Sequence, residues 1–473
     1  MPVALSKPDD SPKEAFKAGF RAYSNGDYDL ALQTWTPLAE RGATEAQVNL
    51  GIMYARGQGV EADGAAAAGW YLRAAEQGHA KAQFNLGVMY ENGNGVEEDL
   101  AAAARWYRAA AAQKHVPALY ALGLLLQEGR GVARDCEEAA NVLQRAADKG
   151  YAKAQCTLGA LFEEGDGVER DPARASHWYT EAAEQNHPPA CYRLGLLYQA
   201  GAGVARDEGK ALIWFRKAAD NEDLDAQCML GAIYEHGRGK KKNPEKALRW
   251  YGRAAGKGHP GACHALGEIH EHGRGVSVDL AQAVSLYKRG ARDGHGPCSF
   301  SLGLLHQNGR GVARDIDRAL ALVGAAAEAG HAPALYHLGT LYANGEDVPG
   351  DNVKAVVLYR EAAKRDHLPA CVAIGRACLE GQGIRRDADA ALHWFRHAAD
   401  RGNADAQFSL GLMIAQGEAV ESNLVEAYVW FDLAVKQDHA EALKTRSVIG
   451  KRMTPAEIND AEEGSRAWKP TAP

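Results

Sequence analysis

One spacing governs this chain: a glycine recurs every 36 residues from Gly51 to Gly411, with no insertion anywhere in between. The residue before each of these glycines is leucine, except at Ile374. A second glycine follows six residues later throughout (Gly57 to Gly417), and an alanine follows sixteen residues later (Ala67 to Ala427). A fixed period of this length is the signature of a repeat protein, in which each unit is one supersecondary element. The 473 residues therefore predict eleven like units rather than a few globular domains.

Each unit is predicted to consist of two helices. In the second unit, Ala82, Leu86 and Tyr90 are four residues apart and so share one helix face. Gly93 can end this helix in the left-handed conformation, which glycine adopts without steric penalty. Asp99 fits the N-cap of a second helix, which the apolar spacing carries through residues 103–111.

The glycine inside each first helix needs a compensating contact, because a mid-helix glycine costs about 1 kcal/mol relative to alanine. A missing Cβ lets a bulky side chain from the second helix come close. We expect that side chain to be the tryptophan or aliphatic residue at positions 70, 106, 142, 178, 214, 250, 286, 322, 358, 394 and 430. No unit can bury its apolar faces alone, so neighbouring units must stack. The predicted fold is an all-α solenoid.

The two ends of the chain depart from the repeat. Residues 1–12 are rich in proline and charge and are predicted to be disordered. Residues 13–43 resemble a partial repeat that caps the N-terminal end, and residues 44–439 hold the eleven full units. Residues 440–473 are predicted to form a degraded twelfth unit, with Ser447 at the glycine position, and a polar C-terminal capping helix. That helix would open with the capping box Thr454-Pro455-Ala456-Glu457.

Composition narrows the class of protein. A net charge of −7 and a pI near 6.2 argue against a nucleic-acid binder, which usually carries a basic face. No apolar run is long enough to span a membrane, and the first residues do not form a secretory signal. The eight cysteines form no CxxC pair and are expected to be small buried thiols in a reducing compartment. We therefore expect a cytoplasmic protein; a periplasmic or secreted protein is the alternative if the sequence is a processed mature form.

The repeat has a family resemblance. The pattern Ala-Gln-Phe-Asn-Leu-Gly-Val-Met-Tyr-Glu-Asn-Gly-Asn-Gly-Val-x-x-Asp, followed by Ala-x-x-Trp-Tyr-x-x-Ala-Ala-x-x-x-His, closely resembles the Sel1-like repeat, a relative of the tetratricopeptide repeat. The match covers about residues 44–447, and the segments around Gly26 and Arg452 look like those of bacterial members. The resemblance implies a right-handed superhelix that serves as a non-catalytic adaptor or scaffold in bacterial signalling or complex assembly, without a cofactor.

A candidate binding face lies on the first helices. Positions two before and two after the repeat leucine are about 160° from it around the helix, so the first helix is apolar on two faces. In a curved stack the second face lines the concave side, where it could bind a peptide or helix of a partner protein. Its candidate residues are Phe84, Tyr120, Tyr192, His264, Phe300, Tyr336 and Phe408. The sequence leaves open a second interpretation, in which adjacent first helices bury these side chains.

Histidines recur where one unit meets the next, at positions 79, 115, 187, 259, 295, 331, 367 and 439. The 36-residue period keeps them in separate units, so they cannot share an ion, and we expect them to hydrogen-bond a helix end. A denser set comprises His264, His270, Glu271, His272 and His306. Two of its histidines replace the tyrosine found in other units, so we expect no metal site there.

Loop irregularities are expected to give secondary contacts with a partner: Lys240–Lys242, Glu346-Asp347 and Glu418-Ala419. Two further function classes stay as alternatives. A β-lactam-binding or β-lactamase-like activity would need more than the single S-x-x-K match at Ser285–Lys288, which has no companion S-D-N or K-T-G motif. The other is a structural protein that self-assembles through the exposed ends of the solenoid.

Overall fold

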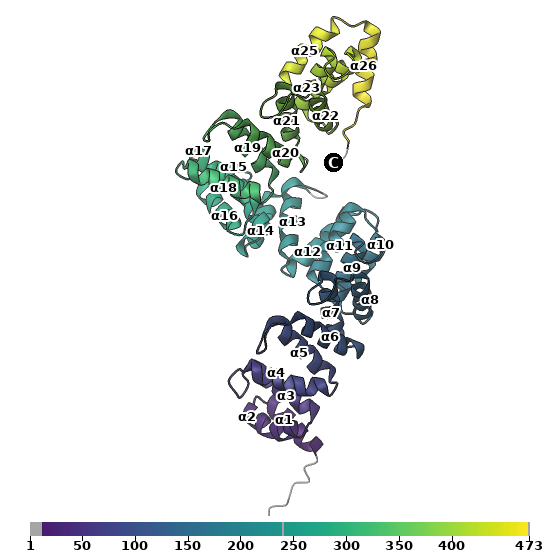
Figure 1. The fold of residues 1–473 in the computed structure, drawn as a ribbon, viewed down its shortest axis with the longest axis vertical. Helices are drawn as coiled ribbons and strands as arrows, with labels where there is room; N and C mark the ends of the chain where they lie inside the picture. Colours follow the sequence, from purple (N-terminus) through teal and green to yellow (C-terminus); the bar gives the residue numbers. More distant parts are fainter. Residues whose placement is uncertain (1–11, 239–240, 472–473) are drawn as a thin grey trace, which may run out of the picture. The chain divides into compact units, whose positions relative to one another are not determined.

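The computed structural model describes residues 12–238 and 241–471. These described residues form 26 helices and no strand (Figure 1). The chain divides into two compact units, residues 1–241 and 242–473, and we describe each by itself. The prediction of an all-helical repeat fold is confirmed.

The helices of the first unit are α1 (Pro12–Ser24), α2 (Tyr28–Glu40), α3 (Thr44–Arg56), α4 (Gly64–Glu76), α5 (Ala80–Asn92), α6 (Leu100–Ala112), α7 (Val116–Glu128), α8 (Cys136–Ala147), α9 (Ala152–Glu164), α10 (Pro172–Glu184), α11 (Pro188–Ala200), α12 (Glu208–Asp220) and α13 (Leu224–His236). Those of the second unit are α14 (Pro244–Gly256), α15 (Pro260–His272), α16 (Leu280–Arg292), α17 (Gly296–Asn308), α18 (Ile316–Glu328), α19 (Ala332–Asn344), α20 (Asn352–Ala363), α21 (Leu368–Glu380), α22 (Ala388–Asp400), α23 (Ala404–Gln416), α24 (Leu424–Val435), α25 (Ala440–Gly450) and α26 (Pro455–Ala467). Within each unit, a first helix packs on its own second helix, which packs in turn on the next first helix (Figure 1).

The loop between the two helices follows the predicted chemistry. Gly93 ends α5 in the left-handed conformation with φ +66°, and its N–H donates to the carbonyl of Met89. Asp99 caps α6, since its carboxylate accepts a hydrogen bond of 2.8 Å from the N–H of Ala102. The second loop glycine, Gly95, lies directly against the backbone of Gly64 in the preceding repeat, where a Cβ would overlap it. The loop therefore ties each repeat to its neighbour as well as turning the chain.

The glycine inside each first helix does accept a bulky side chain, but our prediction of which residue is wrong by one position. A Cβ on Gly87 would lie 2.6 Å from the ring of Tyr107, not against Trp106. The residues that lie over the glycines in this way are Tyr71, Tyr107, Leu143, Tyr179, Phe215, Tyr287, Val323, Tyr359, Phe395 and Phe431. Trp70 packs instead, half-buried, against the core of the preceding helices, beside Leu50 and Met53. One position thus closes the hairpin and its neighbour joins the hairpin to the preceding repeat.

A buried glutamine that the sequence analysis did not single out links three helices. Gln155 on α9 donates to the carbonyl of Ala147 at the end of α8, at 3.2 Å, and accepts from Gln185 at the end of α10, at 2.8 Å. The same pair of bonds recurs with Gln47 and Gln77, Gln83 and Gln113, and Gln407 and Gln437. The glutamine satisfies a carbonyl that the end of the preceding helix leaves without an intrahelical partner.

The N-terminal end is a complete hairpin of α1 and α2. Trp35 lies over Gly19 and stacks on Phe16 with ring centroids 5.9 Å apart, which reproduces the glycine contact of the repeats. The connection, residues 25–27, is shorter than residues 57–63 of the first full repeat. Pro12 begins α1, so it does not belong to the segment that we expected to be disordered, and residues 1–11 lie outside the described residues.

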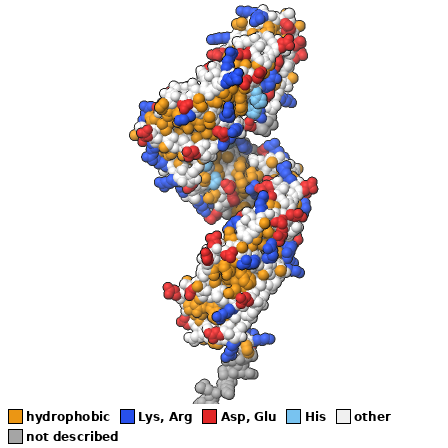
Figure 2. Space-filling model, in the orientation of Figure 1, with side chains coloured by type: hydrophobic (Ala, Val, Ile, Leu, Met, Phe, Trp, Pro, Cys, Tyr) orange, Lys and Arg blue, Asp and Glu red, His pale blue; other side chains and the backbone are white. Residues whose placement is uncertain are grey.

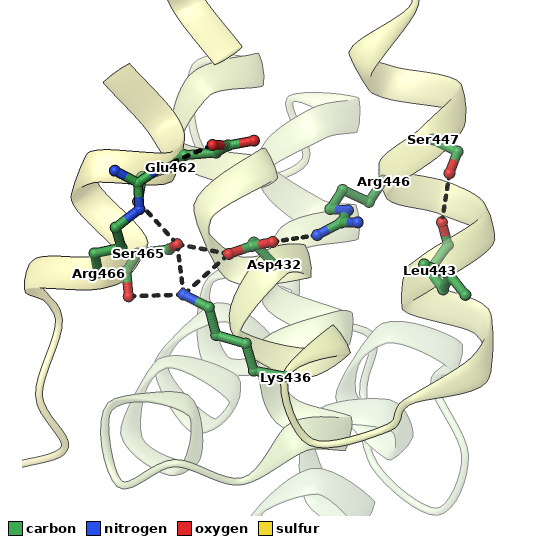
Figure 3. Close-up of polar contacts among 8 residues, drawn as sticks. All are labelled: Asp432, Lys436, Leu443, Arg446, Ser447, Glu462, Ser465 and Arg466. Carbon is green, nitrogen blue, oxygen red and sulfur yellow. Dashed lines mark hydrogen bonds and ion pairs between the residues drawn. The ribbon is translucent and has the colours of Figure 1, made fainter. Parts of the chain in front are cut away.

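The C-terminal helix covers an outer face of the last full repeat. Helix α26 opens with the predicted capping box at Thr454 and Glu457, and it packs on α24 rather than on α25. Figure 3 shows Asp432 of α24 pointing into a set of polar groups from α24, α25 and α26. Its carboxylate accepts from the hydroxyl of Ser465 at 2.6 Å and from Lys436 at 3.1 Å, and it pairs with Arg446.

Asp432 is only 7% exposed, and its charge is fully compensated. Burial by itself raises the pKa of Asp432, but hydrogen bonds from Ser465, Lys436 and Arg446 outweigh burial and hold the pKa below its ordinary value. In the preceding repeat the same position carries the exposed Arg396. An aspartate replaces the usual surface residue where a capping helix covers the position.

We expect Gly375→Ala to destabilise the chain by about 1–3 kcal/mol, because the added Cβ would lie 2.5 Å from the ring of Phe395. Gly324→Ala is the matched control: Gly324 is also helical, but a Cβ added there would have no heavy atom within 4 Å apart from its chain neighbours and the nearby backbone of its own helix. The control should leave stability unchanged or raise it by up to about 1 kcal/mol. Urea unfolding followed by circular dichroism measures both, and equal effects would contradict the close-contact account.

Asp432→Ala should destabilise the C-terminal repeats by about 2 kcal/mol, because it leaves Ser465, Lys436 and Arg446 without their shared acceptor. Arg396→Ala, at the equivalent position 36 residues earlier, should cost about 0.5 kcal/mol or less, because its ion pair with Glu426 is exposed. Thermal melting compares the two variants. A loss of similar size in both would show that the cluster around Asp432 does not hold α26 in place.

Candidate functional site

The seven residues predicted to form a binding face are all half-buried on first helices, and we call them the aromatic row. Phe84, Tyr120 and Tyr192 belong to the first unit, whereas His264, Phe300, Tyr336 and Phe408 belong to the second. Each ring leaves part of its surface accessible. The interpretation of full burial holds only for the aliphatic members of the same series, since Val48 and Val372 are 2% and 5% exposed.

Rings on either side fix the aromatic row. The ring centroid of Phe84 lies 5.7 Å from that of Tyr107, which covers the repeat glycine, and 5.0 Å from that of His115 at the junction with the next repeat. Tyr336 repeats the arrangement with Tyr359 at 5.7 Å and His367 at 5.0 Å. Further contacts of this kind join Tyr192 to Phe215, Phe300 to His331, His264 to Tyr287 and His295, and Phe408 to Phe431 and His439. Packed rings of this kind lose little conformational freedom when a ligand binds.

Hollows open between consecutive first helices on this face. One of about 610 Å³ lies between α3 and α5 and is lined by Ile52, Val88 and Met89 together with polar residues. Another of about 460 Å³ lies between α21 and α23 and is lined by Phe408 and Leu412 with acidic side chains at its rim. Figure 2 shows apolar side chains on the surface interspersed with charged ones. The hollows give each unit an apolar floor with charged edges.

A tyrosine–glutamate pair, which the sequence analysis missed, lies beside the aromatic row in several repeats. The hydroxyl of Tyr179, the ring over Gly159, donates to Glu163 at 2.7 Å, and Arg193 of the following repeat lies 3.7 Å from the same carboxylate. Tyr107 donates to Glu91 at 2.6 Å with Arg130 at 3.8 Å, and Tyr287 donates to Glu271 at 2.9 Å with Arg310 at 3.0 Å. The signal is present in the sequence: in each case a glutamate precedes the tyrosine by sixteen residues.

Burial is the main cause that raises the pKa of Tyr107, Tyr179 and Tyr287, and the neighbouring glutamate raises each further. The hydroxyls therefore stay protonated and act as hydrogen-bond donors. In the first repeat, Ala55 occupies the glutamate position, and burial raises the pKa of Tyr71 to about 12. The first repeat therefore has a protonated tyrosine hydroxyl, that of Tyr71, but no glutamate sixteen residues before it to accept its hydrogen bond.

Junction histidines cap helices, as predicted, in five repeats. The Nδ1 atom of His115 accepts from the N–H of Ala118 at 3.3 Å, and His79, His259, His295 and His439 make the same bond. His187, His331 and His367 make no such bond, so the prediction is wrong for them. Asn403 caps α23 in the same way, with a bond of 2.9 Å to Ala406.

Three members of the denser histidine set make local polar contacts. Glu271 accepts from Tyr287, the Nδ1 atom of His272 contacts the carbonyl of Glu268 at 3.0 Å, and His264 lies 3.3 Å from the hydroxyl of Ser301. His306 is buried, and His270 is half-buried on the same helix as Glu271. Within residues 12–238 and 241–471, no group of three or more such side chains is placed to hold a metal ion.

Two of the loop irregularities bind neighbouring loops. Arg314 lies 3.5 Å from Asp347, and Arg386 pairs with Glu418 at 2.9 Å, so both carboxylates connect consecutive repeats. Of the basic loop Lys240–Lys242, Lys240 lies outside the described residues, and Lys241 and Lys242 are exposed. Ser285 and Lys288 are exposed on α16, with Leu286 buried between them.

All eight cysteines are free, and Cys191, Cys263, Cys298, Cys371 and Cys378 are buried. Burial raises the pKa of the Cys298 thiol to about 12 and that of Cys371 to about 11. A thiol with so high a pKa is a poor nucleophile. These side chains act as small apolar groups of the core.

The repeats themselves decide the family. The Sel1 repeat model matches eleven consecutive segments: 44–79, 80–115, 116–151, 152–187, 188–223, 224–259, 260–295, 297–331, 332–367, 368–403 and 404–439. The chain belongs to the Sel1 repeat family. Sel1 repeat solenoids resemble tetratricopeptide-repeat solenoids, a fold typical of protein-interaction scaffolds.

Solved structures of other Sel1 proteins resemble this chain. The protein c5321, a protective antigen present in uropathogenic Escherichia coli strains, displays an SLR fold; it is 33% identical, with 92% of this chain and 94% of that chain covered and a TM-score of 0.61. A Sel1 repeat protein from Oxalobacter formigenes is 36% identical, covering 51% of this chain and 96% of its own, with a TM-score of 0.48. No curated protein matches the chain. Among the described residues, no helix combines the length and apolar character needed to cross a membrane.

The lowered pKa values of two capping histidines, His115 and His295, predict that the folded chain loses stability in mild acid. Burial, followed by the charges of Lys81 and His79, lowers the pKa of His115, and burial followed by His264 and His259 lowers that of His295. Each folded pKa lies below the unfolded value of about 6.5, so the unfolded chain binds more protons between the two values. The stabilising contribution is therefore complete above about pH 7 and declines as the pH falls below about 6.5.

The variant His115→Asn/His295→Asn should keep the caps, as Asn403 does, but remove the titration. Near pH 7.5 the variant should melt below the wild type, because it loses the ring contacts of His115 with Phe84 and of His295 with His264. Between pH 7.5 and pH 5.5 the melting temperature of the variant should decrease less than that of the wild type. Calorimetry at the two pH values measures this difference. The same decrease in both chains would show that other groups cause the pH dependence.

Proposed function

We propose that this Sel1 repeat protein is a non-catalytic adaptor that binds a peptide or helix of a partner protein at the residues of the aromatic row that lie within one unit or the other. The row would serve in bacterial signalling or complex assembly, and the cytoplasm stays the predicted location. The observation that carries the proposal is the state of the row: its rings are held by neighbouring rings yet are only half-buried. Pre-positioned aromatic side chains next to hollows are typical of binding hot spots.

The chemistry of the hollows supports a peptide rather than a small reacting substrate. The floor between α21 and α23 combines Phe408, Leu412 and Met413, whereas its rim carries polar and charged groups. Apolar side chains of a peptide could enter such hollows at intervals, as in helix-in-groove recognition. The hydroxyls of Tyr107, Tyr179 and Tyr287 are already engaged with glutamates, so they stabilise their repeats rather than prepare a nucleophile.

Two alanine variants test the row in each unit separately: Tyr120→Ala/Tyr192→Ala in the first unit and Phe300→Ala/Tyr336→Ala in the second. Affinity capture from the source cell, quantified by mass spectrometry, should show at least about a tenfold loss of the partner for one or both variants. Melting curves first establish that each variant is folded at the temperature of the capture.

The matched control removes exposed apolar side chains from second helices: Ile213→Ala on α12, which is 65% exposed, and Val353→Ala/Val357→Ala on α20, which are 62% and 53% exposed. These variants should capture the partner as well as the wild type does. If folded variants of the row also capture it unchanged, or if the control variants lose it, the binding surface lies elsewhere.

A further inference from the structure

The hollow between α3 and α5 differs in charge from the surroundings of Tyr107, Tyr179 and Tyr287, where a glutamate accepts the tyrosine hydroxyl. Arg56 and Lys81 stand at its edge, and Tyr71 and Asn85 also line it. None of the residues that line it is acidic. Neither Arg56 nor Lys81 makes an ion pair with any residue in the described part of the chain. The hollow therefore holds two unneutralised positive charges.

Other repeats show what this arrangement binds. Around Tyr107, Tyr179 and Tyr287, a carboxylate accepts the tyrosine hydroxyl and lies 3.0–3.8 Å from an arginine of the following repeat. The carboxylate comes from the residue sixteen positions before the tyrosine. In the first repeat that residue is Ala55, which itself lines the hollow. The hydroxyl is present, and the internal carboxylate is replaced by a methyl group. The cations differ in position: Arg56 belongs to the same repeat and Lys81 to the following one, whereas Asn94 and Asn85 stand at the positions of Arg130 and Arg193.

The hydroxyl of Tyr71 is available as a donor. Burial raises its pKa to about 12, while the Asn85 side chain and the charge of Arg56 act in the opposite direction. Arg56 and Tyr71 line the same hollow. Hydrogen bonds from a neutral donor and a cation to one carboxylate are stronger than bonds between neutral groups.

We propose that the hollow between α3 and α5 binds an acidic side chain, glutamate or aspartate, of the partner peptide, with the hydroxyl of Tyr71 and the cations Arg56 and Lys81 as its ligands. This inference rests on the proposed function and adds the chemistry of the partner to it. The partner carboxylate takes the place that Glu91, Glu163 and Glu271 fill in their own repeats. Ile52, Val88 and Met89 receive the apolar part of the same peptide segment.

The acidic hollow of the second unit provides the contrast. There Glu380 and Asp405 occupy the positions that Arg56 and Lys81 occupy between α3 and α5, and Phe395 replaces Tyr71. Four carboxylates line that hollow together with the cation Arg376, so a further carboxylate would be disfavoured there, and no tyrosine hydroxyl is among the lining groups. Of these two hollows, we therefore expect only the one between α3 and α5 to prefer acidic side chains.

Two variants of the full chain test the proposal. Arg56→Gln/Lys81→Gln removes the cations and keeps the side-chain length. Ala55→Glu supplies the missing carboxylate from within, as Glu163 does for Tyr179, and should exclude an external one. Ala415→Glu is the matched control: it adds the same charge at the same helix position, where the ring over the glycine is Phe431 and has no hydroxyl.

The probes are a fluorescein-labelled helical peptide of leucine, alanine and glutamate, and copies in which glutamine or phosphoserine replaces each glutamate. Fluorescence polarisation should show that the wild type and Ala415→Glu bind the glutamate peptide about tenfold more tightly than its glutamine copy. Arg56→Gln/Lys81→Gln and Ala55→Glu should both lose this preference. Ala55→Glu should in addition melt at a higher temperature than the wild type, because it completes the contact of Tyr71.

The outcomes separate this inference from the proposed function. Equal binding of the glutamate and glutamine peptides by the wild type would overturn the inference and leave the aromatic row as a binding face. A preference that survives in both variants, or a phosphoserine copy bound more tightly than the glutamate peptide, would also overturn it. If the wild type binds none of the peptides, the carboxylate site fails, and the capture experiment with the variants of the aromatic row decides the proposed function by itself.

Discussion

Contact between a side chain of each second helix and a glycine of each first helix sets the geometry of this solenoid. Where the chain has Gly87, the ring of Tyr107 takes the space that a Cβ would fill, so a larger residue at this position would collide with the ring. The glycine gives up helix propensity for this packing. Because the alanines from Ala67 to Ala427 are also at most 3% exposed, the interior of each hairpin has almost no room for a larger side chain. An identical period in every repeat follows from that restriction.

The helices, the loops and the caps could be predicted from the sequence, because each rests on local chemistry. An aspartate directly before a run of helical apolar periodicity caps the helix, as Asp99 does for α6. A glycine after such a run ends the helix in the left-handed conformation, as Gly93 does for α5. The register of the glycine contact could not be predicted in this way. Positions 106 and 107 are adjacent and both apolar, so either fits the helical period. The rotation of the second helix about its own axis chooses between them, and this rotation depends on packing against two neighbours.

The candidate site shows a similar division. Periodicity alone predicts which side chains share the second face of the first helices, but it does not predict how far adjacent helices cover them. The outcome depends on size at each position: Val48 is covered, whereas Phe84 extends beyond its neighbours and stays half-exposed. The pairing of Tyr107 with Glu91 was within reach of the sequence, because aligned repeats show tyrosine together with glutamate sixteen residues before it. The contacts of Asp432 could not be predicted from the repeats, because Asp432 bonds to Ser465 of α26. This helix lies outside the repeat pattern and packs on α24.

Ring-current displacement of the glycine Hα resonances, recorded by NMR on a chain with labelled glycine, tests the central contact most directly. The account predicts a displaced resonance for Gly87 that Tyr107→Leu abolishes and Trp106→Leu leaves in place. Gly123, which lies under Leu143, should show no displacement. A Gly87 resonance that responds to Trp106→Leu and not to Tyr107→Leu would contradict the account.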